Sequence, residues 1–425
     1  IAFSGDTGGS GGPHLHFEIR DTKSEHVINP MLFGINIPDS KSPTIQSLLG
    51  YPLSEDARIN QQNNSHKISI KHMGNGKYIA DRVTASGTIG FGVHVFDRLD
   101  NAWNKNGIYS LEMLVNGKRH YYHDVSTFSF AESKYLNLLI DYSYYKKYKR
   151  RIQKTFKENK NELSIYKDLI NNGKINIKSG FNYSIEIIAK DIVGNTSSVK
   201  IPVIGKKSNA VFKKQKDTTA YKIIADNFQK FKKENVTIAF PKNTFYQDIY
   251  LDFKVDSGVA KVHTPSIPLN KSYTLTFNVS KYTAQEKEQL YIANTEYAKY
   301  PRYVNTRKKD TTFYTTTKTL GKYTLKIDTL KPDVKILYIY NKQWITSAKT
   351  LKVKVSDVDS GIKNWRATID DSWVLMQYNH KKGVLTYNFS DKILVGSKHI
   401  FKLVLSDNVG NTTERSITFF KKQTK

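Results

Sequence analysis

A seven-residue segment occurs twice in this chain and constrains its fold more than any other sequence feature. Asp191-Ile-Val-Gly-Asn-Thr-Ser197 recurs as Asp407-Asn-Val-Gly-Asn-Thr-Thr413, and in both copies an apolar segment precedes it and a β-rich segment follows it. Asp, Asn and Gly are typical of tight turns between strands, because their side chains bond the local backbone and tolerate positive φ. The repeat therefore predicts two related domains that share this turn.

A second pair of motifs lies upstream of each copy. Val95-Phe96-Asp97 is followed by Gly107-Ile108, and Val355-Ser356-Asp357 is followed by Gly361-Ile362. Short segments rich in Val, Ile, Tyr, Phe and Thr fill most of the chain between turn residues, a pattern that favours β-sandwiches. The clearest predicted strands are 67–71, 88–96, 109–115, 183–190, 273–279, 322–327, 351–355 and 400–405.

The predicted fold class is all-β, with about three immunoglobulin-like β-sandwich domains after a short N-terminal part. At 425 residues the chain is too long for one ordinary domain, and breakers at Asn29-Pro30 and Ile37-Pro38 place the first boundary near residue 40. We expect residues 1–39 as a separate part, a sandwich at 40–205 with a basic insertion near 142–172, a basic linker at 206–235, a less similar sandwich at 236–329 and a sandwich at 330–425.

The charge of the chain limits its partners. It has 66 Lys and Arg residues against 38 Asp and Glu residues, a formal net charge of +28. A field of this size attracts anionic wall polymers or lipid head groups, whereas the lack of a nucleic-acid-binding motif argues against specific DNA or RNA binding. A solvated Lys-rich surface explains the charge as well. Tyr142, Tyr144, Tyr145 and Tyr148 alternate with the basic residues of the insertion, a pattern that suits an anionic glycan or lipid surface.

The chain has no Cys, so His and carboxylates are the only candidates for metal binding or catalysis. No apolar run reaches the roughly 18 residues of a membrane helix. The strongest chemical signal is a Gly-rich stretch followed by Gly12-Pro-His14-Leu-His16-Phe-Glu18. Side chains two apart on a strand share a face, so one imidazole could bind a divalent cation while its neighbour handles a proton or stabilises developing charge.

The string from Ser4 to Arg20, followed by Asn29-Pro30, resembles the end of the catalytic domain of lysostaphin/LytM-type zinc metallopeptidases, the peptidoglycan endopeptidases. The resemblance covers roughly residues 1 to 35, so it implies that residues 1–39 are the C-terminal end of a β-rich catalytic domain. It implies that His16 is a Zn²⁺ ligand and that His14 is a catalytic residue that assists the zinc-bound water or the transition state.

The family's His-x-x-x-Asp motif and a further catalytic His are expected before Ile1, together with a signal or anchor. On this interpretation the full-length protein is a zinc metalloendopeptidase that hydrolyses peptide bonds of peptidoglycan in the bacterial cell envelope, periplasmic or extracellular. The chain alone is then inactive, and its sandwiches are positioning or binding modules. Two alternatives stay open: a catalytically dead metallopeptidase-like scaffold or regulator of cell-wall hydrolysis, and an adhesive or carbohydrate-binding β-sandwich array.

Two other patterns resemble metal sites, but we interpret their residues as parts of a strand and of turns. His120-Tyr-Tyr-His-Asp124 spells His-x-x-x-Asp, but it follows an Asn116-Gly117 turn and is predicted to be a hairpin strand. Asp357-Val-Asp359-Ser-Gly361 and the two repeated turns offer oxygen ligands of the kind that calcium prefers. Their ligands are few, and turn chemistry explains them better.

Overall fold

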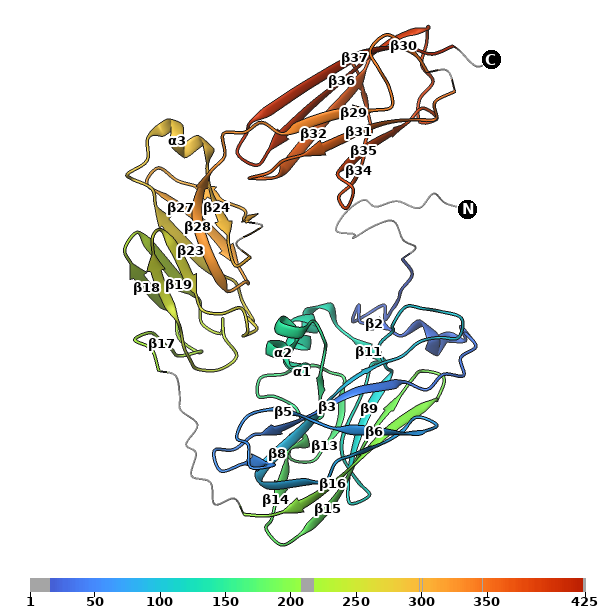
Figure 1. The fold of residues 1–425 in the computed structure, drawn as a ribbon, viewed down its shortest axis with the longest axis vertical. Coiled ribbons are helices and arrows are strands. Elements are labelled where there is room, and N and C mark those ends of the chain that lie inside the picture. The colour runs from blue at the N-terminus through green and yellow to red at the C-terminus, as the bar shows by residue number, and fades with distance from the viewer. Residues whose placement is uncertain (1–15, 208–217, 298, 300, 346, 423–425) are drawn as a thin grey trace.

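The computed structural model describes residues 16–207, 218–297, 299, 301–345 and 347–422. The described residues form three β-sandwich domains in chain order, and Figure 1 shows the middle one between the other two. We call them the first sandwich (44–205), the middle sandwich (222–327) and the last sandwich (333–420). The predicted all-β, immunoglobulin-like fold class is confirmed. Within the described ranges no helix is long and apolar enough to cross a membrane.

The first sandwich is a thirteen-stranded β structure around one apolar core. Its strands are β3 (Thr44–Pro52), β4 (Arg58–Ile59), β5 (His66–Ile68), β6 (Ile70–Gly74), β7 (Lys77–Ala80), β8 (Val83–Phe96), β9 (Ser110–Val115), β10 (Lys118–Asp124), β12 (Gln153–Lys154), β13 (Tyr166–Leu169), β14 (Ile175–Ile177), β15 (Asn182–Lys190) and β16 (Thr196–Gly205). Strand β8 joins the two layers, because residues 83–85 pair with β16 and residues 89–96 pair with β3. Gly87 lies between these halves at φ 68°, where a Cβ would lie 2.8 Å from the Ala57 Cα.

Helical residues cluster in the insertion of the first sandwich. They form η2 (Phe130–Tyr135), α1 (Leu136–Leu139) and α2 (Tyr142–Tyr148), and a short η3 (Asn171–Gly173) follows. The insertion therefore begins earlier than the predicted residue 142. Its apolar side chains form a small core with Tyr246 of the middle sandwich, so α1 and α2 lie where the first and middle sandwiches meet (Figure 1).

The middle sandwich consists of two five-stranded sheets and a short β pair. Its elements are β17 (Lys222–Ile223), β18 (Gln229–Lys233), β19 (Val236–Phe240), β20 (Ile249–Tyr250), β21 (Phe253–Asp256), β22 (Val259–Val262), β23 (Tyr273–Asn278), α3 (Ala284–Gln289), β24 (Leu290–Asn294), β25 (Arg302–Tyr303), β26 (Arg307–Lys308), β27 (Thr312–Thr317) and β28 (Gly321–Ile327). The predicted linker at 206–235 is too long, because β18 pairs with β19 and Ile223 is buried in the same core.

The last sandwich repeats the strand pairing of the first. Its strands are β29 (Asp333–Leu337), β30 (Gln343–Trp344), β31 (Thr350–Ser356), β32 (Ile362–Ile369), β33 (Ser372–Val374), β34 (Gln377–Asn379), β35 (Val384–Asn388), β36 (Lys398–Asp407) and β37 (Thr412–Phe420). Strand β29 pairs with β31 as β3 pairs with β8, and β36 lies between β32 and β37 as β15 lies between β9 and β16. The two repeated motifs thus mark a duplicated domain, as predicted.

All eight segments predicted as strands fall on observed strands, with 67–71 divided between β5 and β6. The alternation that predicted them is visible as burial. In β15, Ile185, Ile187 and Ala189 are fully buried, while the residues between them are partly exposed. Before the first sandwich lie β1 (Ile19–Arg20), β2 (Val27–Ile28) and η1 (Pro30–Phe33), and β2 also pairs with β11 (Thr127–Phe128) of the insertion.

Candidate functional sites

Of the two predicted site histidines, His16 is described and His14 lies outside the described residues. The His16 side chain is 67% exposed, and its Nε2 lies 3.4 Å from Oε2 of Glu18. Glu18 also bonds the Arg20 guanidinium, which, with a smaller contribution from His16, holds the pKa of the Glu18 carboxyl below its usual value. Within the described part of the predicted strand, strand pairing begins only at Ile19.

A zinc site at His16 is incomplete in the described part of the chain. A catalytic zinc ion takes three protein ligands and water. The groups of three or more His, Asp or Glu residues found among the described residues do not contain His16. Among the described residues, His16 thus has no neighbouring group of candidate ligands that would complete such a site.

The segment that carries His16 is attached to the first sandwich. Ile19 pairs with Ile28, and Ile28 pairs with Thr127 of the insertion. The Asn29 N–H donates to the Ser126 carbonyl at 2.8 Å, and the Arg20 guanidinium lies 5.1 Å from the centre of the Phe130 ring. Residues 19–29 are thus hydrogen-bonded to the first sandwich, although the sequence placed them in a separate part.

The His-x-x-x-Asp segment at 120–124 forms strand β10, the second strand of a hairpin, as predicted. The His120 Nε2 lies 3.0 Å from the Lys174 carbonyl, and Asp124 accepts a hydrogen bond from the Ser126 hydroxyl at 2.6 Å. His123 is fully buried beside the Tyr121 hydroxyl, and burial lowers its pKa to about 4. These residues serve the core and turn of the hairpin.

Three of the four tyrosines of the basic insertion are in contact with cations of the same segment. Lys146 lies 5.3 Å from the Tyr142 ring centre, Lys147 lies 5.0 Å from Tyr148, and Arg151 lies 4.9 Å from Tyr145. Each such cation–π contact occupies one of the two ring faces on which a sugar could stack. Lys154, also counted in the basic run, is buried and bonds Glu158 at 2.7 Å. The insertion is therefore a weaker glycan platform than its sequence suggests.

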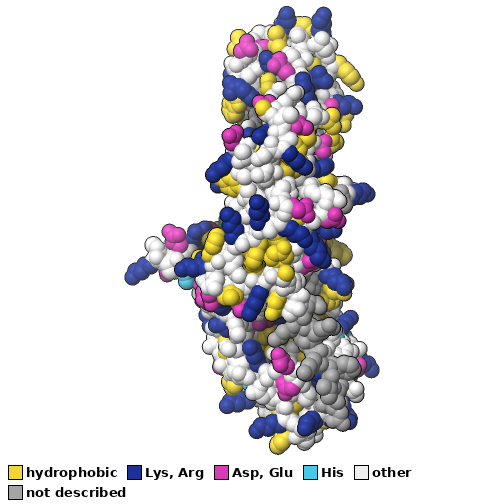
Figure 2. All heavy atoms as spheres, turned by 90° about the vertical axis from the view of Figure 1, so that its left-hand side faces the viewer, with side chains coloured by type: hydrophobic (Ala, Val, Ile, Leu, Met, Phe, Trp, Pro, Cys, Tyr) yellow, Lys and Arg dark blue, Asp and Glu magenta, His cyan; other side chains and the backbone are white. Residues whose placement is uncertain are grey.

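The surface charge is widely spread. Figure 2 shows Lys and Arg side chains scattered from one end of this face to the other, with Asp and Glu side chains fewer and interspersed. On the face that Figure 2 shows, the basic side chains form no single dense patch, so the net charge of +28 is not concentrated at one place there. This distribution fits the solvated Lys-rich surface that the sequence left open.

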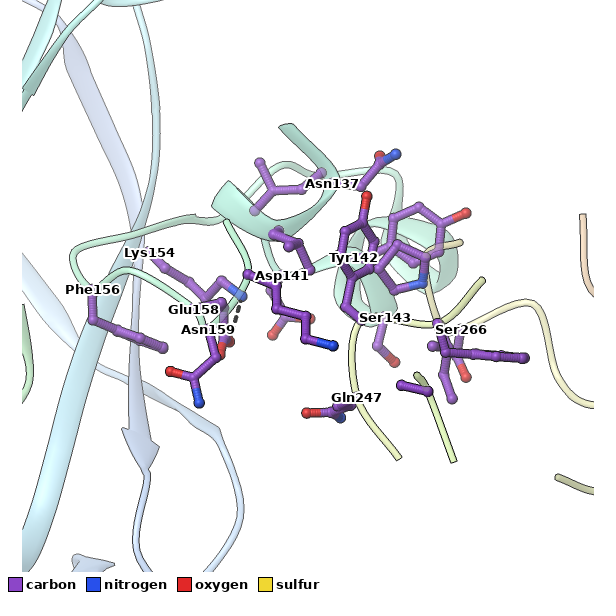
Figure 3. A pocket seen from close by; sticks show the side chains of 18 of the residues that line it. Asn137, Asp141, Tyr142, Ser143, Lys154, Phe156, Glu158, Asn159, Gln247 and Ser266 are labelled. Atoms are coloured by element: carbon purple, nitrogen blue, oxygen red, sulfur yellow. Dashed lines mark hydrogen bonds and ion pairs between the residues drawn. The ribbon is translucent and has the colours of Figure 1, made fainter. Parts of the chain in front are cut away.

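A cavity of about 610 Å³ lies between the insertion and the middle sandwich. Figure 3 shows Asn137, Asp141 and Tyr142 of the insertion on one side and Gln247 and Ser266 of the middle sandwich on the other. Asp141 is held in place because it accepts hydrogen bonds from the Tyr144 N–H at 2.9 Å and the Tyr51 hydroxyl at 3.0 Å. Aromatic rings beside amides and carboxylates are suited to a polar organic ligand.

Two groups of three aspartates converge at equivalent places in the duplicated domains. Asp39, Asp97 and Asp191 form the first acidic cluster, and Asp328, Asp357 and Asp407 form the second; in each, one carboxylate oxygen from each aspartate lies within 4.8 Å of one from each of the other two. From the sequence, Asp191, Asp357 and Asp407 were interpreted as turn residues, and Asp97 was noted only as part of a repeated motif. Asp39 and Asp328 were missed, although Asp39-x-x-x-Pro43 and Asp328-x-x-x-Pro332 were an available signal.

The turn interpretation of the repeated motif is confirmed in detail. The Asp191 carboxylate accepts from the N–H groups of Gly194 and Asn195 at 2.7 and 2.8 Å. The equivalent Asp407 accepts from Gly410 and Asn411 at 2.7 and 2.9 Å. These bonds close the same turn in both copies.

Comparison with known proteins adds little about function. Residues 220–328 match the family model of a Zu5-like domain, which is the middle sandwich. No curated protein matches the sequence. Several solved structures are distantly similar to this chain. An endo-β-1,4-mannanase from Thermotoga petrophila has 13% identity and a TM-score of 0.19, and the match covers 23% of this chain and only 21% of that chain.

Two further solved structures match over most of this chain. The fibronectin(III)-like modules of CbhA from Clostridium thermocellum have 9% identity and a TM-score of 0.18, covering 84% of this chain and 94% of that chain. SGBP-B of a mixed-linkage glucan utilization locus of Bacteroides ovatus, in complex with a mixed-linkage heptasaccharide, has 9% identity and a TM-score of 0.15, covering 87% and 71%. Similarities this distant carry no argument about function.

Proposed function

We propose that this chain is the C-terminal region of a zinc metalloendopeptidase that hydrolyses peptide bonds of bacterial peptidoglycan in the cell envelope. The observation that carries the proposal is the Gly-rich string that ends in His14-Leu-His16-Phe-Glu18, with its resemblance to lysostaphin/LytM-type enzymes. The pairing of β1 with β2, and of β2 with β11, supports a positioning role for the sandwiches. A catalytic domain ending in this segment would be fastened to the first sandwich.

In this proposal His16 is one zinc ligand, and the remaining ligands precede Ile1. Bound zinc would supply Lewis-acid chemistry, polarising the scissile carbonyl and lowering the pKa of water. Glu18 beside His16 Nε2 at 3.4 Å fits a supporting role, because carboxylates often orient metal-binding imidazoles through the ring nitrogen that does not bind the metal. His14 is proposed as the residue that assists the transition state.

The test uses the full-length protein that carries this chain. His16→Ala should lose both bound zinc and the clearing of purified peptidoglycan suspensions, whereas His14→Ala should keep zinc and lose rate. His26→Ala, in the same segment, is the matched control and should behave as the parent. A His14→Ala protein with full zinc content and undiminished clearing would remove the role given to His14. A zinc-free, inactive parent would favour the scaffold alternative.

A second candidate function is glycan binding in the cavity between the insertion and the middle sandwich, which would make the array a wall-binding module. The observation that favours it is the combination of Tyr142, Asn137 and Gln247 around one 610 Å³ cavity. Pull-down of soluble peptidoglycan fragments should weaken with Tyr142→Ala or Gln247→Ala. Tyr148→Ala is the control, because Tyr148 is on the same helix but does not line this cavity. Equal binding by all three variants would remove this candidate.

A further inference from the structure

The first acidic cluster concentrates negative charge in a buried place. Asp39 precedes β3, Asp97 follows β8 and Asp191 follows β15, so three separate segments bring one carboxylate each to the cluster. Asp97 is 4% exposed and Asp191 is 2% exposed. Burial of ionised carboxylates is unfavourable unless a counter-charge or hydrogen-bond donors compensate. The question is therefore what compensates these three.

Two carboxylate oxygens of this cluster have no hydrogen-bond partner among the described residues. They are Oδ1 of Asp97 and Oδ2 of Asp39, and both atoms are buried. The nearby cation Lys41 makes its hydrogen bond outside the cluster, because its Nζ bonds the Leu99 carbonyl at 3.1 Å and lies 3.9 Å from Asp100. Its charge is a minor influence that lowers the pKa of Asp97. Burial, with the charges of Asp191 and Asp39, raises the pKa of Asp97. The first acidic cluster therefore combines negative charge with carboxylate oxygens whose lone pairs accept no hydrogen bond from the described residues.

The second acidic cluster provides an internal comparison, because backbone N–H groups satisfy it. The Asp328 carboxylate accepts from the N–H groups of Leu330 at 3.0 Å and Ser360 at 2.9 Å. Asp357 accepts from the N–H groups of Asp359 and Gly361. The short turn at 357–361 supplies three of these four donors.

The corresponding segment of the first sandwich, residues 97–107, is longer. The Arg98 N–H bonds Asp97, and Asp39 accepts from the Lys41 N–H at 3.1 Å as Asp328 accepts from Leu330. There the Ser40 N–H donates to Asp100 at 3.0 Å and not to a member of the cluster. The two clusters share their carboxylates but differ in the donors around them. Among the described residues, Asp97 of the first cluster is 4% exposed and its buried Oδ1 has no hydrogen-bond partner, whereas no buried carboxylate oxygen of the second cluster is left without one.

We propose that Asp39, Asp97 and Asp191 bind one calcium ion, and that the second acidic cluster does not require one. Calcium prefers carboxylate oxygens at about 2.3–2.6 Å, so ligands on opposite sides of the ion lie about 4.8 Å apart. One carboxylate oxygen from each aspartate of this cluster lies within 4.8 Å of one from each of the other two. Magnesium, with ligands at about 2.0–2.1 Å, requires a tighter octahedral set. The turn bonds of Asp191 are compatible with the ion, because Oδ1 accepts two of them and Oδ2 accepts only one, from the Asn195 side-chain amide. A carboxylate oxygen has two lone pairs, so one lone pair of Oδ2 is available to a cation.

The ion would fasten the chain that precedes the first sandwich. Asp39 lies just before β3, whereas Asp97 and Asp191 follow strands of the sandwich itself. A cation shared by the three would hold residue 39 against the turns after β8 and β15. This role is independent of the proposed peptidase function, because it concerns only described residues of the sandwich and its leading segment.

Isothermal titration of calcium chloride into the EDTA-treated, dialysed chain tests the proposal. We expect one ion per chain with Kd at or below about 10⁻³ M, as in extracellular calcium modules. Asp97→Asn should weaken binding at least tenfold, whereas Asp357→Asn, the matched change in the second acidic cluster, should leave the stoichiometry and Kd of the parent. Magnesium at equal concentration should bind more weakly.

Thermal melting supplies a second measurement. In EDTA, Asp97→Asn should melt at or above the temperature of the parent, because it removes one of three repelling charges; in calcium the order should reverse. If the Asp97→Asn variant does not fold, Asp39→Asn is used in its place. The proposal is overturned if no heat is detected up to about 10 mM calcium. The proposal is also overturned if the Asp97 and Asp357 variants lose calcium binding equally, or if calcium does not reverse the order of the melting temperatures. In that case the Asp97 carboxyl would carry a proton instead of binding a cation.

Discussion

Asn411 is expected to hold the last sandwich to the chain that leads into it. Its side-chain amide donates to the carbonyls of Asp328 and Leu330, each at 3.1 Å, and to the Asp407 carboxylate at 2.7 Å. Asp328 and Leu330 precede β29, whereas Asn411 lies in the turn between β36 and β37. Asn411→Ala removes all three bonds and leaves the backbone of the turn in place.

The size of the effect follows from these bonds. A neutral hydrogen bond contributes about 1 kcal/mol and one to a charged group about 1.5–3 kcal/mol. Because Asn411 is only partly buried, water replaces part of what is lost, and we expect a loss of about 2–3 kcal/mol in the free energy of unfolding. With a urea m-value of about 2 kcal/mol/M, the midpoint should fall by about 1–1.5 M.

Tryptophan fluorescence during urea unfolding measures this domain selectively. Trp344, Trp365 and Trp373 belong to the last sandwich, and the fourth tryptophan, Trp103, is 95% exposed in the first. Asn195→Ala, the equivalent change in the first sandwich, is the control and should leave the tryptophan transition in place. An Asn411→Ala midpoint within about 0.3 M of the parent would refute the assigned hydrogen-bond energies. An equal shift in both variants would show that the bonds do not act locally.

Two further measurements concern buried charge and surface charge. Burial lowers the pKa of His123 from 6.5 to about 4, so between these pH values the unfolded chain binds more protons than the folded one and stability falls as the pH falls. His123→Leu should therefore show a smaller drop in melting temperature from pH 7 to pH 4.5 than the parent; an identical drop would assign the effect to other groups. Co-sedimentation with anionic wall polymer should disappear by roughly 0.5 M salt, because the Debye length falls from about 10 Å at 0.1 M to about 3 Å at 1 M. Gln at Lys147, Lys149 and Arg150 should reduce it no more than Gln at the exposed Lys335, Lys352 and Lys398; a much larger loss from the first set would restore the insertion as a binding site.

The strands could be predicted from the sequence because their signal is local. Alternating apolar residues, as in Ile185, Ile187 and Ala189, report burial on one face without knowledge of any partner. The repeated turn was also readable, since Asp191 and Asn195 bond within five residues of sequence. The start of the middle sandwich could not be predicted from the sequence, because the Lys-rich strand β18 resembles a linker until its pairing with β19 is known.

The candidate sites could be predicted only in part, because they depend on residues that are distant in sequence. The cavity joins Tyr142 to Gln247 of another domain, and no pattern in either segment indicates the other. Alternation of Tyr and Lys likewise gave no information on whether Lys146 would cover Tyr142 or leave its ring open. The spacing of His14 and His16 suggested a metal or proton-transfer site, but the role of His16 as a zinc ligand rests on a family resemblance.

The duplicated turn has a consequence for how the domains are joined. In the first sandwich Asn195 donates to the Asp39 carbonyl at 3.1 Å, and in the last sandwich Asn411 donates to the Asp328 carbonyl at the same distance. Each turn therefore holds the residue that leads into its own first strand. In the last sandwich this residue follows directly after β28, which ends at Ile327. The Asp359 carboxylate also lies 3.5 Å from Lys326 of β28. Because the bonds of Asn411 and Asp359 act on residues at the end of the middle sandwich, they restrict rotation between the middle and last sandwiches, and loss of Asn411 should loosen that junction together with the domain that follows it.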